Sequence, residues 1–158
     1  MQEARRSQWD IIIFLSGVLG VVFLYRLTKN YISGFLDLNE SIAVIGNILR
    51  FTLVHNTGIA FGFFKDCGIV FIIIPVILTG LLVYNVYYYR HSPSMSRVYI
   101  VAFSLILGGA IGNLIDRIYL GYVIDFIDFR VWPVFNLADS AITIGAAIIL
   151  LKCIPSSK

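Results

Sequence analysis

Long apolar runs alternate with polar segments along the chain, and charged residues are rare inside the runs. At a rise of 1.5 Å per residue, helices of this length are close to the thickness of the hydrocarbon core of a bilayer. Arg26 interrupts the end of the first run, but a long basic side chain there can extend toward the interface. The pattern predicts membrane-spanning helices over residues 11–27, 68–89, 98–115 and 134–151.

The segment between the first two runs has a different character. Polar and turn-forming residues return after Thr28, and Arg50 to His55 mixes β-branched and apolar residues as a strand does. Asn56-Thr57-Gly58 follows as a turn signal. We therefore expect an all-α membrane protein with four transmembrane helices. A small extracytoplasmic β-containing segment lies on the membrane surface between helices one and two, and residues 1–158 form a single domain.

Composition agrees with a membrane protein and limits the partners. Hydrophobic residues make up 59% of the chain and charged residues 13%, which lies outside the range of soluble domains. The net charge of +3 is small and spread along the chain, so no nucleic-acid partner is expected.

Four spans place both termini on one side of the membrane. The 12 Lys and Arg residues divide evenly between the two sides. One half of them lies in the short tails and in the tight turn after residue 89, where basic residues favour the cytoplasm. We expect both termini to be cytoplasmic.

Asp139 is the most informative single residue. It lies inside the predicted fourth span, between one and two turns from the outer end. A carboxylate at the centre of such a helix costs roughly 2.5–3.5 kcal/mol, so an acid kept there indicates function. The alternative is a helix N-terminal acid that the helix dipole stabilises.

Asp125 precedes Asp139 in a short connection between the third and fourth spans. Taken alone it is equally well a solvated loop acid. If the connection brings the two carboxylates to hydrogen-bonding separation, both cannot ionise easily and they share one proton. The ionised acid can then take a proton from water while the protonated acid polarises a carbonyl. Such a pair hydrolyses an amide without a metal or cofactor.

Further polar residues surround this region. Asp116 and Arg117 end the predicted third span. Together they can act as an anchor at the membrane interface. Alternatively, Arg117 holds a peptide carbonyl or a lipid phosphate. Asn113 and Asn136 either hydrogen-bond between helices or orient the two carboxylates.

Three glycines, Gly108, Gly109 and Gly112, lie close together in the predicted third span. Small residues at such spacing let a second helix approach closely. We expect a tight helix contact here.

Other chemistries and other classes of protein fit the sequence less well. There is no HExxH motif, no Cys/His cluster and no G-x-S-x-G motif, so neither a zinc site nor a serine nucleophile is expected. A small transporter or proton-coupled subunit would place ionisable groups near the midplane, whereas Asp139 lies toward one face. A purely structural scaffold leaves Asp139 unexplained.

Four sequence blocks resemble the lipoprotein signal peptidase (signal peptidase II) family: NTGIAF at residues 56–61, GGAIGNLIDR at 108–117, YVIDF at 122–126 and FNLADS at 135–140. The blocks occur in the family's order, and the resemblance covers nearly the whole chain. It implies an aspartic endopeptidase of the bacterial cytoplasmic membrane. Such enzymes cut the signal peptide from a prolipoprotein just before a cysteine that carries diacylglycerol.

The resemblance also implies roles for individual residues. Asp125 and Asp139 match the catalytic pair. Leu27-Thr28-Lys29 matches the end of the family's first-span motif, although Tyr25-Arg26 stands where the family usually has Asp-Gln. The residues expected to bind substrate or to support the pair are Lys29, Asn56, Gly58, Phe61, Asn113, Asp116, Arg117 and Asn136.

The resemblance implies diacylglyceryl-modified prolipoproteins and membrane lipids as partners, and an active site toward the outer face. We expect a monomer. The surface segment from Asn30 to Phe64 can cover the peptide. Phe61, Phe63 and Phe64 form part of that clamp or, alternatively, anchor the segment in the interface.

Overall fold

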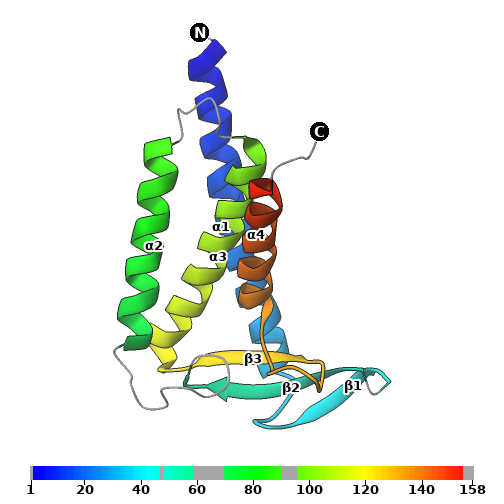
Figure 1. The fold of residues 1–158 in the computed structure, drawn as a ribbon. Coiled ribbons are helices and arrows are strands. Elements are labelled where there is room, and N and C mark those ends of the chain that lie inside the picture. Colours follow the sequence, from blue (N-terminus) through cyan, green and yellow to red (C-terminus); the bar gives the residue numbers. More distant parts are fainter. Residues whose placement is uncertain (1, 47, 59–69, 90–95, 155–158) are drawn as a thin grey trace.

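The computed structural model describes residues 2–46, 48–58, 70–89 and 96–154. Within these ranges the helices are α1 (Gln2–Ser33), α2 (Val70–Tyr89), α3 (Arg97–Leu120) and α4 (Leu137–Cys153). The strands are β1 (Ser41–Ile45), β2 (Leu49–Asn56) and β3 (Val123–Asp128). The helices lie side by side, and the sheet lies across one end of them (Figure 1). The start of α1 and the end of α4 lie at the opposite end.

Helix α3 contacts each of the other three helices, and glycines set the distances. A Cβ atom built on Gly108 would lie 2.7 Å from Cβ of Val21 in α1, and one on Gly109 would lie 2.4 Å from the carbonyl oxygen of Ala138 in α4. These approaches leave no room for a side chain. The close helix contact expected from the glycines is confirmed, and it is made on both sides of α3.

The strands form one antiparallel sheet in the order β1-β2-β3. A small apolar core fixes the sheet to the end of α1; its buried members are Ile32, Leu36, Leu53, Ile124 and Phe126. In the ladder between β2 and β3, Val54 lies opposite Asp125. Burial of the sheet against α1 therefore also fixes the height of Asp125 relative to the helices.

The first two strands lie within the segment where strand structure was expected, but β3 was not predicted. The sequence predicts a connection between helices at residues 123–128 and β structure only in the segment before the second helix. Val123, Ile124, Asp125 and Phe126 are all buried, so apolar residues point to both faces of this strand. The alternation that identifies a strand is absent when both faces are covered.

Several helix ends also differ from the bounds of the predicted spans, and α1 begins at Gln2 instead of 11. Helix α1 continues through Ser33 instead of ending at 27, and α3 continues through Leu120 instead of ending at 115. The predicted spans stop before Lys29 and before Asp116, but these two charges neutralise each other inside the fold. Helix α3 is capped by Gly121, the residue after Leu120, whose φ of 81° is left-handed and suits glycine. Helix α4 begins at Leu137, not at 134.

Two stretches in the described part of the chain are long and apolar enough to cross a membrane, Gln8–Ser33 and Arg97–Leu120. Only 11% of the first is buried by the rest of the protein, so most of its apolar surface is available to lipid. The apolar stretch of α2, Ile72–Tyr88, and the 17-residue α4 are shorter. The arrangement of four spans therefore stays a prediction.

Candidate active site

Asp125 and Asp139 come from different elements and meet where the sheet joins the helices. Asp125 lies on β3 and is 2% exposed. Asp139 lies in the first turn of α4 and is partly exposed. Its position near the helix start corrects the expectation of one to two turns inside the span. The cause is Asn136, which caps the helix three residues earlier.

Asn136 and Asp139 form a capping box. The backbone N–H of Asp139 donates to Oδ1 of Asn136 at 3.0 Å, and the backbone N–H of Asn136 donates to Oδ2 of Asp139 at 3.2 Å. Two otherwise unpaired N–H groups of the helix start are satisfied in this way. The helix start thus fixes the Asp139 carboxylate, and an acid in the first turn is also stabilised by the helix dipole.

The side chain of Asn136 joins the two aspartates. It is fully buried, and its Nδ2 donates to Oδ1 of Asp125 at 2.7 Å and to Oδ1 of Asn113 at 3.1 Å. The Nδ2 of Asn113 donates in turn to Oδ1 of Asp139 at 2.8 Å. The two asparagines therefore orient both carboxylates, which was one of the two roles expected for them.

A second donor reaches Asp125 from β2. The Nδ2 of Asn56 donates to Oδ2 of Asp125 at 2.8 Å. Oδ1 of Asn56 accepts the backbone N–H of Gly58 at 3.0 Å, which fixes the orientation of the amide. Each oxygen of Asp125 thus accepts one amide hydrogen. Gly58 acts on the site through its backbone and through Asn56.

Burial dominates the electrostatics of Asp125. Desolvation disfavours the charged carboxylate and raises its pKa to about 7, and the nearby Asp139 charge acts in the same direction. The amide donors of Asn56 and Asn136 and the positive charge of Arg117 lower the pKa of Asp125 and only partly offset the burial. Asp125 therefore keeps a proton at a pH where an exposed aspartate is ionised.

Arg117 lies in α3 and is partly buried. Its charge acts on Asp139 and Asp125, but its guanidinium makes no hydrogen bond or ion pair with any residue that the structure describes. Five donor N–H groups next to two carboxylates are thus available for a further acceptor. A peptide carbonyl or a phosphate has oxygen atoms that can accept hydrogen bonds from these N–H groups.

The carboxylate of Asp116 pairs with side chains of α1, and not with Arg117, its neighbour in the sequence. It is fully buried, and its carboxylate accepts from Lys29 Nζ and from the hydroxyl of Tyr25, both in α1. Lys29 is 4% exposed and contacts Asp116, not the pair of aspartates. Tyr25 was missed as a partner of the site. From the sequence, a tyrosine in an apolar run indicates only that its hydroxyl needs a hydrogen-bond acceptor, and it does not identify which residue supplies that acceptor.

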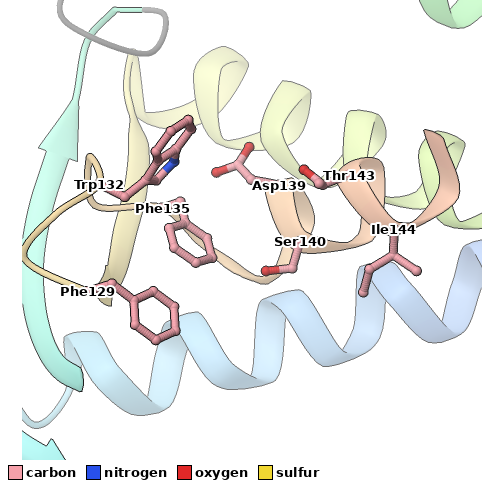
Figure 2. A pocket seen from close by; sticks show the side chains of 7 residues that line it. All are labelled: Phe129, Trp132, Phe135, Asp139, Ser140, Thr143 and Ile144. Atoms are coloured by element: carbon pink, nitrogen blue, oxygen red, sulfur yellow. The ribbon is translucent and has the colours of Figure 1, made fainter. Parts of the chain in front are cut away.

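An open pocket of about 470 Å³ borders Asp139. Figure 2 shows three aromatic side chains from the connection before α4 on one side of it, and α4 side chains on the other. The lining residues are Phe129, Trp132, Phe135, Asp139, Ser140, Thr143 and Ile144. An apolar group held in this pocket would lie beside the carboxylate of Asp139.

The structure thus brings most of the predicted site residues together. Asp125, Asp139, Asn56, Asn113 and Asn136 share one hydrogen-bond network. Phe61 and the aromatic residues after it lie outside the described residues. In the part of the chain that is described, no three His, Cys, Asp or Glu side chains are grouped as metal ligands.

The geometry is suited to acid–base chemistry on an amide. Asp125 is buried and holds its proton, while Asp139 faces an open pocket. A general acid and a general base fixed on one amide framework can polarise a carbonyl and activate a water molecule. Arg117 adds a positive charge at the same place.

Comparison with known proteins gives concordant results. The sequence profile of the family described as Signal peptidase (SPase) II matches residues 10–155. The lipoprotein signal peptidase of Halothermothrix orenii is 43% identical over 134 residues, which cover 85% of this chain and 90% of the relative. That of Moorella thermoacetica is 42% identical over 136 residues, covering 86% and 89%.

Solved structures agree with the sequence comparison. A bacterial membrane enzyme determined by the in meso method at 1.9 Å resolution has a TM-score of 0.78 and 32% sequence identity, and the match covers 95% of each chain. A second such enzyme, determined at 2.3 Å, has a TM-score of 0.78 and 33% identity over 92% of this chain and 87% of the other. The fold described above is therefore also the fold of these membrane enzymes.

Proposed function

The chain belongs to the signal peptidase II family, and we propose that it removes signal peptides from prolipoproteins. In this proposal it cuts just before a cysteine that carries diacylglycerol, with Asp125 and Asp139 as the catalytic pair. The observation that carries the proposal is the side chain of Asn136, which joins both aspartates in one buried hydrogen-bond network. The relatives named as lipoprotein signal peptidases support the same substrate class.

The different surroundings of the two aspartates support different roles. Asp139 faces the pocket and takes a proton from the attacking water, while buried Asp125 gives its proton to the carbonyl oxygen of the scissile bond. The water oxygen bonds to the carbonyl carbon and a neutral diol forms. In the second step Asp139 returns its proton to the amide nitrogen, Asp125 recovers one from a hydroxyl of the diol, and the carbon–nitrogen bond breaks. Both carboxyl groups then have their starting protonation.

The remaining site features support recognition of a lipid-modified peptide. The guanidinium of Arg117 has no hydrogen-bond acceptor among the described residues and its charge acts on both aspartates, so its N–H groups suit a peptide carbonyl next to the scissile bond. The aromatic pocket beside Asp139 suits an apolar part of the substrate. Phe61 remains a proposed part of the clamp over the peptide.

We infer an arrangement with four spans and both termini on the cytoplasmic side. The start of α1 and the end of α4 lie at the end opposite the sheet (Figure 1), so the aspartates would then lie toward the outer face. A diacylated cysteine has its acyl chains in the bilayer, so the scissile bond is held at that depth. The exposed apolar surface of α1 supports contact with lipid.

Cleavage of a defined substrate tests the proposal. Purified protein in detergent would be incubated with a diacylglyceryl-modified prolipoprotein, with the same chain unlipidated, and with a chain whose cysteine is replaced by serine. We expect only the lipidated chain to be cut, with the modified cysteine as the new N-terminus by mass spectrometry. Cleavage of all three chains at the same rate, or of none, would refute the proposed substrate class.

The pH dependence follows from the pKa of Asp125, which is raised to about 7. As the general acid it must be protonated, so kcat/KM is expected to fall as the pH rises through about 7. Asn56→Ala removes a donor that stabilises the ionised carboxylate, so the pKa rises and the alkaline fall moves to higher pH. Initial rates between pH 5 and 9 measure the shift. Movement to lower pH would contradict the assignment of Asp125 as the acid.

Asn136→Ser separates the two roles of this residue. Serine caps a helix about as well as asparagine, but it lacks the Nδ2 group that donates to Asp125 and Asn113. We expect the melting temperature to stay near that of the wild type while kcat falls roughly 10- to 50-fold, because the carboxylates lose their common orientation. Asn136→Ala, which also loses the cap, should lower both. Equal kcat for the wild type and the serine variant would show that the link between the aspartates is dispensable.

A further inference from the structure

Asp116 is a buried carboxylate with four donors among the described residues, and the catalytic steps described above do not use it. The donors are the hydroxyl of Tyr25 at 2.5 Å, Lys29 Nζ, Arg26 Nη1 at 3.5 Å and the backbone N–H of Ile124 at 3.3 Å. Three of them belong to α1 and one to β3. Asp116 itself is on α3, so one carboxylate connects three elements that meet at the site.

The contact with Ile124 is the one that reaches the catalytic pair. Ile124 immediately precedes Asp125, and its N–H lies on the strand that carries the proposed acid. The backbone bond to Asp116 fixes this end of β3 against α3. Asp139 is held from the same helix through Asn113. The relative position of the two aspartates therefore depends on how β3 is fixed to α3.

Tyr25 determines where the Asp116 carboxylate points. The phenol ring is fully buried and lies on the backbone of α3 at Gly112, where a Cβ atom would be 2.8 Å from Cδ1 of the ring. The ring therefore cannot move closer to α3. Its hydroxyl reaches Asp116 about one helical turn further along. The neutral hydroxyl adds a donor without adding charge next to the catalytic aspartates.

We propose that Tyr25 is a positioning residue for the peptidase reaction: through Asp116 and the backbone N–H of Ile124, it holds Asp125 at its working distance from Asp139. The inference rests on the proposed function, since it assigns Tyr25 a role in that reaction. Tyr25 does not contact the substrate. Lys29 neutralises the charge of Asp116 in the same cluster, and the hydroxyl of Tyr25 fixes the orientation of the Asp116 carboxylate.

Tyr25→Phe tests the proposal because it keeps the ring on Gly112 and removes only the hydroxyl. We expect kcat to fall about tenfold with KM unchanged, because the acid moves while the binding surface stays. The alkaline fall of the pH profile should move to lower pH, since a looser Asp125 is better solvated and its pKa returns toward that of an ordinary aspartate. Rates are expressed per folded molecule, with the folded fraction taken from size-exclusion chromatography.

The matched control is Tyr31→Phe, which removes a hydroxyl from a 72% exposed tyrosine on the same helix. It should leave kcat, KM and the pH profile unchanged. A double-mutant cycle with Asn56→Ala adds a second test. Both changes act on Asp125, so their effects on kcat should not be additive, whereas unrelated structural effects at separate sites add.

The outcomes separate the inference from the proposed function. If the wild type does not cut the lipidated substrate, the proposed function fails. If the wild type cuts and Tyr25→Phe has the same kcat and pH profile, only the positioning role of Tyr25 is refuted. If Tyr25→Phe yields no folded protein, Gly112→Ala decides, because it keeps the hydroxyl but displaces the ring. A folded Gly112→Ala variant with wild-type kcat and pH profile would overturn the inference.

Discussion

Asp139→Asn and Asp125→Asn are each expected to lower kcat for prolipoprotein cleavage by about 10⁴-fold, which is the upper range for loss of a general acid or base. Asparagine keeps the shape of the side chain but cannot gain or lose a proton at the pH of the assay. In the proposed mechanism, Asp139→Asn removes the group that takes a proton from water, and Asp125→Asn removes the buried proton donor. Single-turnover cleavage of the lipidated substrate, monitored by mass spectrometry, measures the loss.

Asp128→Asn is the matched control. Asp128 lies on the same strand as Asp125, and its carboxylate accepts from the hydroxyl of Thr52 and from the backbone N–H of Arg130. An asparagine oxygen can keep such contacts, so this variant should cut at the wild-type rate. Both inactive variants should still bind the lipidated substrate with wild-type affinity. More than about a tenth of the wild-type kcat in a folded Asp125→Asn or Asp139→Asn variant would contradict a general acid–base pair.

The large expected fall in kcat of the Asp125→Asn and Asp139→Asn variants follows from the lack of another titrating group that contacts the aspartates in the described part of the chain. Among the residues that the structure describes, the groups that hydrogen-bond to the two aspartates are amides and backbone N–H groups, which do not titrate. Arg117 is a cation and can only donate. Removal of either aspartate therefore leaves one half of the proton transfer without a substitute in the network.

The apolar runs could be predicted as helices because their signal is local. Each run is long and continuous, and its meaning does not depend on distant residues. The two aspartates could be found for a related reason: a carboxylate in an apolar stretch is costly wherever it finally lies. The glycines of α3 gave a correct local signal as well, since their spacing indicates close approach before the partner helix is known.

What could not be predicted depends on pairings across the chain. The predicted spans stop before Lys29 and before Asp116, whereas α1 and α3 continue past them, and the two charges meet across 87 positions of sequence. The hydroxyl of Tyr25 finds its acceptor 91 positions away. Strand β3 was missed because the sheet and the helices bury both of its faces. Asp139 was placed too deep because the cap made by Asn136 fixes the start of α4.

Gly109→Ala is expected to lower both the stability of the fold and its activity. A Cβ atom at this position would lie 2.4 Å from the backbone oxygen of Ala138 and 2.8 Å from Cγ1 of Ile142. A backbone oxygen cannot rotate away, so α3 and α4 must move apart. Overpacking of this kind costs about 1–3 kcal/mol, and we expect a fall of several degrees in the melting temperature in detergent.

The same movement should reach the proposed catalytic pair, because Ala138 immediately precedes Asp139, and Asn113 of α3 donates to Asp139. A shift of about 1 Å between α3 and α4 would lower kcat roughly 100-fold. Gly80→Ala is the control: it adds the same methyl group to α2, where nothing lies within 4 Å, and it should leave kcat unchanged and the melting temperature unchanged or higher. If Gly109→Ala kept the wild-type melting temperature and kcat, the backbones of α3 and α4 would not meet at Gly109, and the link from Asn113 to Asp139 would not depend on their close contact.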